Sequence, residues 1–124
     1  MQYLLMIYSN EVEYAKMDAA TSKKMMEEYG AFTQGIIQSG NFKAGDRLQP
    51  TTTATTVRVH DGKTLTTDGP FAETKEQLLG FFVVECASLE QALETAKDLG
   101  QASSTSGSYE IRPLRPLRPE TPRP

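Results

Sequence analysis

The sequence predicts an α+β domain, a ferredoxin-like βαββαβ sandwich that carries an inserted β-hairpin. Three observations favour this fold. Segments of strand and helix character follow one another in the order β, α, β, hairpin, β, α, β. The segments 2–8 and 78–86 are apolar on both faces, which is typical of central strands whose two faces are both covered. Asp61-Gly62 lies between two β-prone runs, as a two-residue hairpin turn does.

The first strand and the first helix come from residues 2–40. Residues 2–8 place apolar side chains on both faces, because successive side chains of a strand alternate. After a polar connection through Glu11, Asp18 is a good N-cap for a helix that runs to about Ser39. Gly40 is placed to end that helix in the left-handed conformation. One apolar stripe recurs along the helix at spacings of four, three and four residues, formed by Met25, Tyr29, Phe32 and Ile36.

The second strand and the hairpin follow. Phe42 to about Gln49 has strand character, which Gly45 weakens. The run 53–60 is rich in β-branched residues, and we expect only one of its faces to be buried. Residues 63–67 should return antiparallel to that run through the Asp61-Gly62 turn.

The last third of the chain repeats the strand–helix–strand pattern. Ser88 and Gln91 fit a capping box, in which each side chain satisfies a free backbone N–H at a helix start. We expect Gly100 to close this helix and a last strand to cover residues 108–112. The apolar face of the helix is predicted to comprise Leu89, Ala92, Leu93, Ala96 and Leu99.

The predicted sheet has one face without a cover. Two helices can cover only one face of a four-stranded sheet, yet the central strands 2–8 and 78–86 are apolar on both. The economical cover for the second face is another copy of the same sheet. We therefore expect a homodimer.

Composition excludes several classes of protein. No apolar run approaches the roughly 20 residues of a membrane helix, and residues 1–8 lack the features of a signal peptide, so we expect a cytoplasmic protein without a membrane partner. A single cysteine and a single histidine leave no set of residues for a disulfide or a zinc site, and no cofactor motif is present. The net charge is −3, and residues 113–124 carry three Arg against one Glu, which leaves −5 on residues 1–112. An acidic body argues against direct binding to nucleic acid.

The loop that follows the hairpin carries a family signature. Asp68-Gly69-Pro70-Phe71, continued by Ala-Glu-Thr-Lys-Glu-Gln-Leu, resembles the DGPF group of the YCII-related proteins over residues 1–113. The resemblance implies a dimeric α/β-barrel assembly, in which two sheets pack face to face around a cleft. It also implies a His–Asp pair as the family's active site, but the sequence offers no match for that histidine. His60, the one histidine, is expected at an exposed hairpin end.

Residues 114–124 form an Arg/Pro-rich C-terminal tail. Proline recurs at every third position from Pro113 to Pro119, a pattern typical of an extended polyproline II chain. We expect this tail to be disordered, with a docking peptide as the alternative.

Asp68 is the first candidate for chemistry. It ends the hairpin beside the expected cleft, and Pro70 restricts the backbone that follows. Two roles stay open for it, which can coexist. The carboxylate can accept backbone N–H groups of the turn, or it can act as a catalytic group.

Four further residues are candidate ligand-binding groups. Tyr8 is expected to line the cleft. Glu73 and Lys75 lie within one short turn, so they can shift a proton or hold an anionic ligand, although a solvated loop with a weak ion pair is the simpler account. Arg112 shares a strand face with Glu110, so it pairs with that side chain or binds a carboxylate of a ligand. Cys86 is predicted to be a buried spacer.

Two functions are compatible with these features. The first is a small dimeric enzyme or ligand-binding protein whose cleft lies near Asp68 and takes a small molecule. The second is a regulatory interaction module, because the resemblance implies association with sigma factors and so with transcription initiation. A narrow cleft that holds Asp68 beside another ionisable group would favour the first function. A solvent-facing Asp68 and an exposed apolar patch would favour the second.

Overall fold

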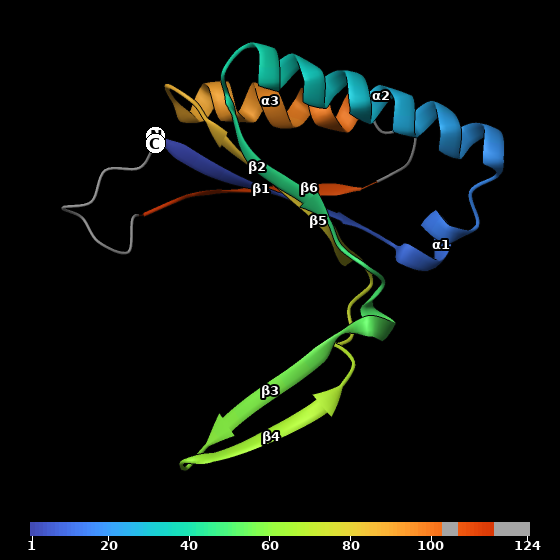
Figure 1. The fold of residues 1–124 in the computed structure, drawn as a ribbon, viewed down its shortest axis with the longest axis vertical. Helices are drawn as coiled ribbons and strands as arrows, with labels where there is room; N and C mark the ends of the chain where they lie inside the picture. Colours follow the sequence, from blue (N-terminus) through green and yellow to red (C-terminus); the bar gives the residue numbers. More distant parts are fainter. Residues whose placement is uncertain (103–106, 116–124) are drawn as a thin grey trace.

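The structure is a computed structural model that describes residues 1–102 and 107–115 (Figure 1). Its main sheet is antiparallel, with strand order β2-β5-β1-β6, so the central strands are the two that the sequence predicted. Two helices cover one face of this sheet (Figure 1). The α+β class is confirmed, and the element order is compatible with a ferredoxin-like sandwich. The elements are β1 (Gln2–Ser9), α2 (Ala19–Gln38), β2 (Phe42–Arg47), β5 (Gln77–Glu85), α3 (Leu89–Ala102) and β6 (Ser108–Pro113).

The inserted hairpin forms an arm of its own. Strands β3 (Thr55–His60) and β4 (Lys63–Asp68) pair only with each other and project from the side of the sheet that the helices leave open (Figure 1). The turn has positive φ at both positions, 50° at Asp61 and 73° at Gly62, as the sequence predicted. A 3₁₀ turn, Thr51–Thr53, leads into the arm.

The core lies between the sheet and the helices. Leu5 and Val84 from the two central strands are fully buried there, together with Leu99 of α3 and Met25 of α2. Cys86 is also buried, as predicted, and desolvation raises the pKa of its thiol. The helix caps follow the sequence prediction as well. The Asp18 carboxylate accepts the N–H of Thr21 at 2.7 Å, and Gly40 ends α2 with φ of 81°.

The predicted inner face of α3 is partly wrong. Leu89 and Leu93 remain 55% and 45% exposed, because only the narrower stripe of Ala92, Ala96 and Leu99 meets the sheet. The helix also runs through Gly100 to Ala102, so that glycine does not end it. A Cβ at Gly100 would lie 3.4 Å from the Tyr109 ring, which shows that this glycine allows close packing against β6.

Two other boundaries differ from the sequence prediction. A short helix, α1 (Glu11–Ala15), occupies the expected polar connection, and the Asn10 side chain caps it by accepting the N–H of Glu13 at 3.0 Å. Strand β2 ends at Arg47, before the expected Gln49.

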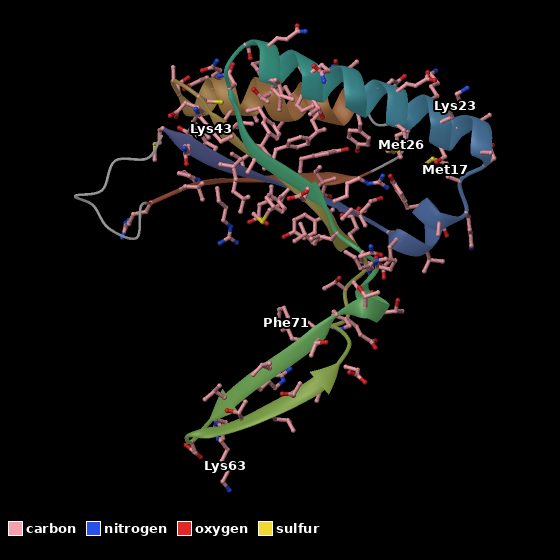
Figure 2. The ribbon with its side chains drawn as sticks, viewed as in Figure 1. Met17, Lys23, Met26, Lys43, Lys63 and Phe71 are labelled. Atoms are coloured by element: carbon pink, nitrogen blue, oxygen red, sulfur yellow. The ribbon has the colours of Figure 1, made fainter. Side chains whose placement is uncertain are left out.

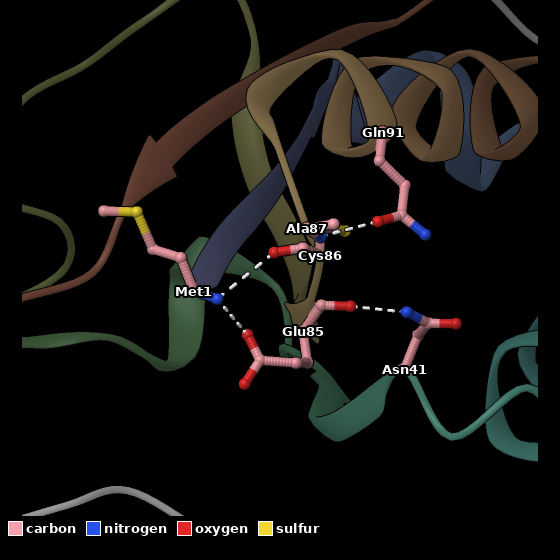
Figure 3. A network of polar contacts seen from close by, with 6 residues as sticks. All are labelled: Met1, Asn41, Glu85, Cys86, Ala87 and Gln91. Atoms are coloured by element: carbon pink, nitrogen blue, oxygen red, sulfur yellow. Dashed lines mark hydrogen bonds and ion pairs between the residues drawn. The ribbon is translucent and has the colours of Figure 1, made fainter.

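A network of polar contacts joins the start of β1 to the end of β5 (Figure 3). The Met1 ammonium lies 2.6 Å from Glu85 Oε2 and donates to the carbonyl of Cys86. This cation lowers the pKa of Glu85. Nearby, the predicted capping box forms with one change. Ser88 Oγ accepts the N–H of Gln91, whereas the Gln91 side chain accepts the N–H of Ala87 in place of that of Ser88.

The face of the main sheet opposite the helices, here called the open face, is apolar at its centre. Strand pairing places Leu4 and Met6 of β1 on this face beside Val83 and Phe81 of β5. All four side chains are partly buried. No helix of the described residues covers them (Figure 1).

The arm is exposed on both faces, so the expectation that one face is buried is wrong for the single chain. Val57 and Val59 are 59% and 71% exposed on one face, and Leu65 is 59% exposed on the other. Phe71 beside the base of the arm is 75% exposed (Figure 2). The arm projects too far from the core for α2 or α3 to cover it.

Two further expectations concern membrane-spanning segments and the C-terminal tail. No helix in the described part of the chain is long and apolar enough to cross a membrane. Of the predicted tail, residues 116–124 lie outside the described residues. Leu114 donates its N–H to the carbonyl of Gln2 at 2.9 Å, so pairing with β1 continues past the expected domain boundary at residue 113.

Candidate functional site

A cleft of about 970 Å³ lies where the arm joins the main sheet. One wall is residues 48–54, and the other is formed by residues 69–74, 76 and 77, which continue the signature. Tyr8 and Leu78 line it as well, and these two residues are direct partners in the β1–β5 pairing. Since Tyr8 alternates with Ile7 and shares its face with Met6, the cleft opens onto the apolar open face.

Helix α1 and its cap hold the two walls together. The Glu11 carboxylate accepts both the N–H and the hydroxyl of Thr51 in the first wall. The Glu11 N–H donates to Gln77 Oε1 at 2.9 Å, and Asn10 Nδ2 donates to the carbonyl of Lys75 at 3.1 Å, both in the second wall. One short turn therefore fixes the width of the cleft. Sequence reasoning missed it, although Asn10 followed by Glu13 is a recognisable helix start.

The base of the arm fixes the loop from the other side. Gly69 donates its N–H to the carbonyl of Ala54 at 2.7 Å, and its own carbonyl accepts the Thr56 hydroxyl at 2.7 Å. The guanidinium of Arg58 donates to the carbonyl of Phe71 at 3.1 Å. Gly69 has φ of 92°, which an L side chain rarely adopts, so a glycine is required here.

Asp68 does not line this cleft. It is the last residue of β4, where it pairs with Thr55, and its side chain is exposed. Within residues 1–102 and 107–115 its carboxylate accepts no hydrogen bond from the turn, because the N–H of Gly69 points to Ala54. The strand pairing places Asp68 on the same face of the arm as Val57 and Val59.

The other predicted residues divide into two groups. Tyr8 and Glu73 line the cleft, whereas Lys75 is exposed outside it and contributes its carbonyl to Asn10. Arg112 lies on the open face, where it pairs with Leu4 of β1. Its Nε donates to Glu110 Oε2 at 2.7 Å, and that carboxylate raises the pKa of Arg112, with a smaller contribution from Tyr8. The structure thus brings Tyr8 close to Arg112 but leaves Asp68 apart from both.

The lining of the cleft is mostly apolar, and the charged side chains on it are acidic. Glu73 and Glu76 line it, and Glu76 accepts the hydroxyl of Ser108 at 2.7 Å. Thr51, Thr52 and Thr53 line the other wall, where the hydroxyl of Thr51 donates to Glu11 and that of Thr53 to the carbonyl of Pro50. Among the described residues, no group of three His, Cys, Asp or Glu side chains is placed to hold a metal ion.

Comparisons with known proteins place the chain in a family. The sequence model of the YCII-related domain matches residues 1–118. An uncharacterized protein of Rhizobium meliloti (strain 1021) is 41% identical over 119 residues, which cover 96% of both chains. The chain therefore belongs to the YCII-related family.

Proposed function

We propose that the chain is a DGPF-group member of this family and works as a homodimer that binds a small organic molecule in the cleft beside Tyr8. One observation carries the proposal. Tyr8 and Leu78 belong both to the cleft and to the apolar open face, so a cover on that face would also close the cleft from one side. Closed clefts of a few hundred to about a thousand Å³ are typical of sites for small ligands.

A second copy of the chain is the cover that suits this surface best. The open face combines an apolar centre with the Arg112–Glu110 pair on β6. Homodimer interfaces are commonly apolar in their centre and polar at their rim. The arm adds the exposed side chains Val57 and Val59, which a partner would also bury.

The charges of the cleft indicate the class of ligand. Glu73 and Glu76 line it, whereas the ammonium of Lys75 lies outside. A neutral or cationic molecule with hydroxyl or amine groups therefore suits the cleft better than an anion does. In this assembly Asp68 would act on the arm face that the partner covers, where loss of water strengthens any interaction of its carboxylate.

A titration of small cations tests the proposal. We expect primary amines to bind more tightly than carboxylates of the same size, as measured by calorimetry. Glu73→Gln should weaken amine binding several-fold, while the matched variant Glu90→Gln on the exposed side of α3 should not. Equal affinity for amines and carboxylates in the parent protein would contradict the assignment.

A regulatory interaction module is the second candidate, and the arm is the observation that favours it. Asp68 faces solvent and Val57, Val59 and Phe71 are exposed in the single chain. Those are the features expected of a surface for another protein, including a sigma-factor domain. A monomer in solution that shows no ligand binding would favour the module over the ligand-binding dimer.

A further inference from the structure

A second cavity, of about 370 Å³, lies on the helix side of the sheet. It is bounded by α2 above and by β2 and β5 below, and it shares no described lining residue with the cleft beside Tyr8. Its walls are mostly apolar. This cavity is therefore independent of the site proposed above and does not depend on a dimer.

Glycine residues contribute to the walls of this cavity from three elements. Gly30 of α2, Gly45 of β2 and Gly80 of β5 all line the cavity. A Cβ added at Gly80 would lie 2.8 Å from the carbonyl oxygen of Asp46, so the close approach of β2 to β5 excludes any side chain there. A Cβ added at Gly30 would meet nothing within 4 Å. Gly30 is itself exposed, so a side chain added there would enter open space at the rim of the cavity.

Aromatic rings line the inner part of the cavity. Phe82 and Phe42 meet edge to face, with ring centroids 6.3 Å apart, and both line the space. The ring of Phe32 also meets that of Phe82 edge to face, with centroids 5.5 Å apart. Ring edges and faces held in this way favour a flat apolar ligand.

One exposed cation at the cavity has no carboxylate partner in the part of the chain that the structure describes. Arg47 lines it, and Arg47 Nη1 lies 3.3 Å from the sulfur of Met26, a weak and uncharged acceptor. Met26 is on α2 at the end near α1 (Figure 2). None of the ion pairs within residues 1–102 and 107–115 includes Arg47, in contrast to Arg112. Neighbouring Asp46 also lines the cavity, but it pairs with Phe81, so strand alternation directs its side chain away from the face that carries Arg47.

We propose that this cavity binds a small flat organic monoanion, with its apolar body between α2 and the sheet and its carboxylate on Arg47. An aromatic carboxylate satisfies both features. The volume is within the range of small-ligand pockets, and a guanidinium binds a carboxylate through two parallel hydrogen bonds. A carboxylate would replace the Met26 sulfur as the partner of Arg47.

The test compares 2-naphthoate with its neutral analogue 2-naphthalenemethanol by calorimetry. We expect the parent protein to bind naphthoate about tenfold more tightly, the effect of one charge-assisted contact. Arg47→Gln should remove that preference and leave the affinity for the alcohol unchanged, and Arg47→Lys should restore part of it. Lys23→Gln on α2 is the control for a general change of charge.

A larger side chain at Gly30 tests whether the ligand binds in this cavity. Gly30→Leu should fill the cavity and weaken both compounds at least about tenfold. Gly35→Leu is its matched control, since Gly35 is on the same helix, has nothing within 4 Å of an added Cβ and does not line the cavity. Thermal unfolding should show that both variants remain folded.

Amide chemical shifts give a measurement that does not depend on the variants. Naphthoate should shift the N–H signals of Gly30, Gly45 and Gly80 in the parent protein. Three results would overturn the proposal. They are no saturable naphthoate binding at millimolar concentration, equal binding to folded Gly30→Leu, or shifts confined to Tyr8 and Leu78.

Discussion

Glu11 binds Thr51 through both oxygens of its carboxylate, and this contact joins the segment after β1 to the first wall of the cleft. Because the same residue donates its N–H to Gln77 in the second wall, Glu11 connects three parts of the chain that are far apart in sequence. The Glu11 side chain therefore holds the first wall, while its backbone N–H and the Asn10 side chain hold the second.

Glu11→Ala should loosen the cleft. Loss of two hydrogen bonds to a charged acceptor should lower the free energy of unfolding by about 1 to 3 kcal/mol, measured by urea denaturation. Amine binding in the cleft should weaken as well. Glu13→Ala is the control, because Glu13 is an exposed residue of the same helix whose ion pair with Lys16, 3.7 Å long, contributes little. If Glu11→Ala and Glu13→Ala have the same free energy of unfolding and the same affinity for amines, the contact with Thr51 does not hold the wall of the cleft.

Gly80→Ala should destabilise the sheet. The new methyl group would lie 2.8 Å from a backbone oxygen of β2, which cannot move without breaking strand pairing. We expect a loss of about 1 to 3 kcal/mol, typical of overpacking. Gly35→Ala should instead increase the free energy of unfolding, since it adds a methyl group in open space on a helix and raises helix propensity. Thermal melts of both variants check this contrast.

Asp18 should make folding stability depend on pH. The N–H of Thr21 lowers the pKa of its carboxyl below the ordinary value of 3.8, so the folded state favours the ionised form. A group with a lowered folded pKa stabilises above its unfolded pKa, and the contribution is lost as pH falls through the folded value. The contribution should therefore be present at pH 7, begin to fall below about pH 3.8 and be absent below the lower pKa of the folded state.

The Asn variant is the matched comparison for that carboxylate. Asp18→Asn retains an acceptor for the cap but does not titrate, whereas Asp18→Ala has no acceptor. The difference in stability between the parent and Asp18→Asn should shrink on acidification. The range from pH 7 to pH 3 includes the ordinary pKa of 3.8. A difference in stability that stays constant over this range would show that the carboxylate charge has no role.

Local sequence signals predicted much of the fold, and distant contacts account for what they missed. Asp18, Gly40 and the Asp61-Gly62 turn act through their nearest neighbours, so their patterns were sufficient. Gly100 resembled a helix end, but its role is contact with the Tyr109 ring on another element. Periodicity placed Leu93 on the inner face, although the contact area of α3 is narrower than its apolar stripe.

The candidate site was less predictable for the same reason. The signature loop indicated where a cleft would lie, and Tyr8 and Glu73 do line one. No local pattern shows that Glu11 reaches Thr51, because that contact depends on how the chain folds over 40 residues. Nor does the sequence show that the arm stands clear of the sheet, which leaves Asp68 exposed outside the cleft.

Variants of Asp68 allow effects on folding stability and on ligand affinity to be measured separately. Since its side chain is exposed and makes no hydrogen bond within the described residues, Asp68→Asn and Asp68→Ala should each change the free energy of unfolding by less than about 0.5 kcal/mol. If the carboxylate acts in the assembled dimer, both variants should lose ligand affinity together. Melting curves and calorimetry on the same samples measure the two effects. A large loss of stability in the Ala variant alone would indicate a turn cap.

Sedimentation equilibrium at micromolar concentration tests the central claim, that a second copy covers the open face and completes the cleft. The chain has a mass of 13.7 kDa. We predict a particle of twice this mass, which should dissociate when Val83, on the open face beside Leu4, is changed to Asp. A parent protein that sediments at 13.7 kDa throughout this range would contradict the account.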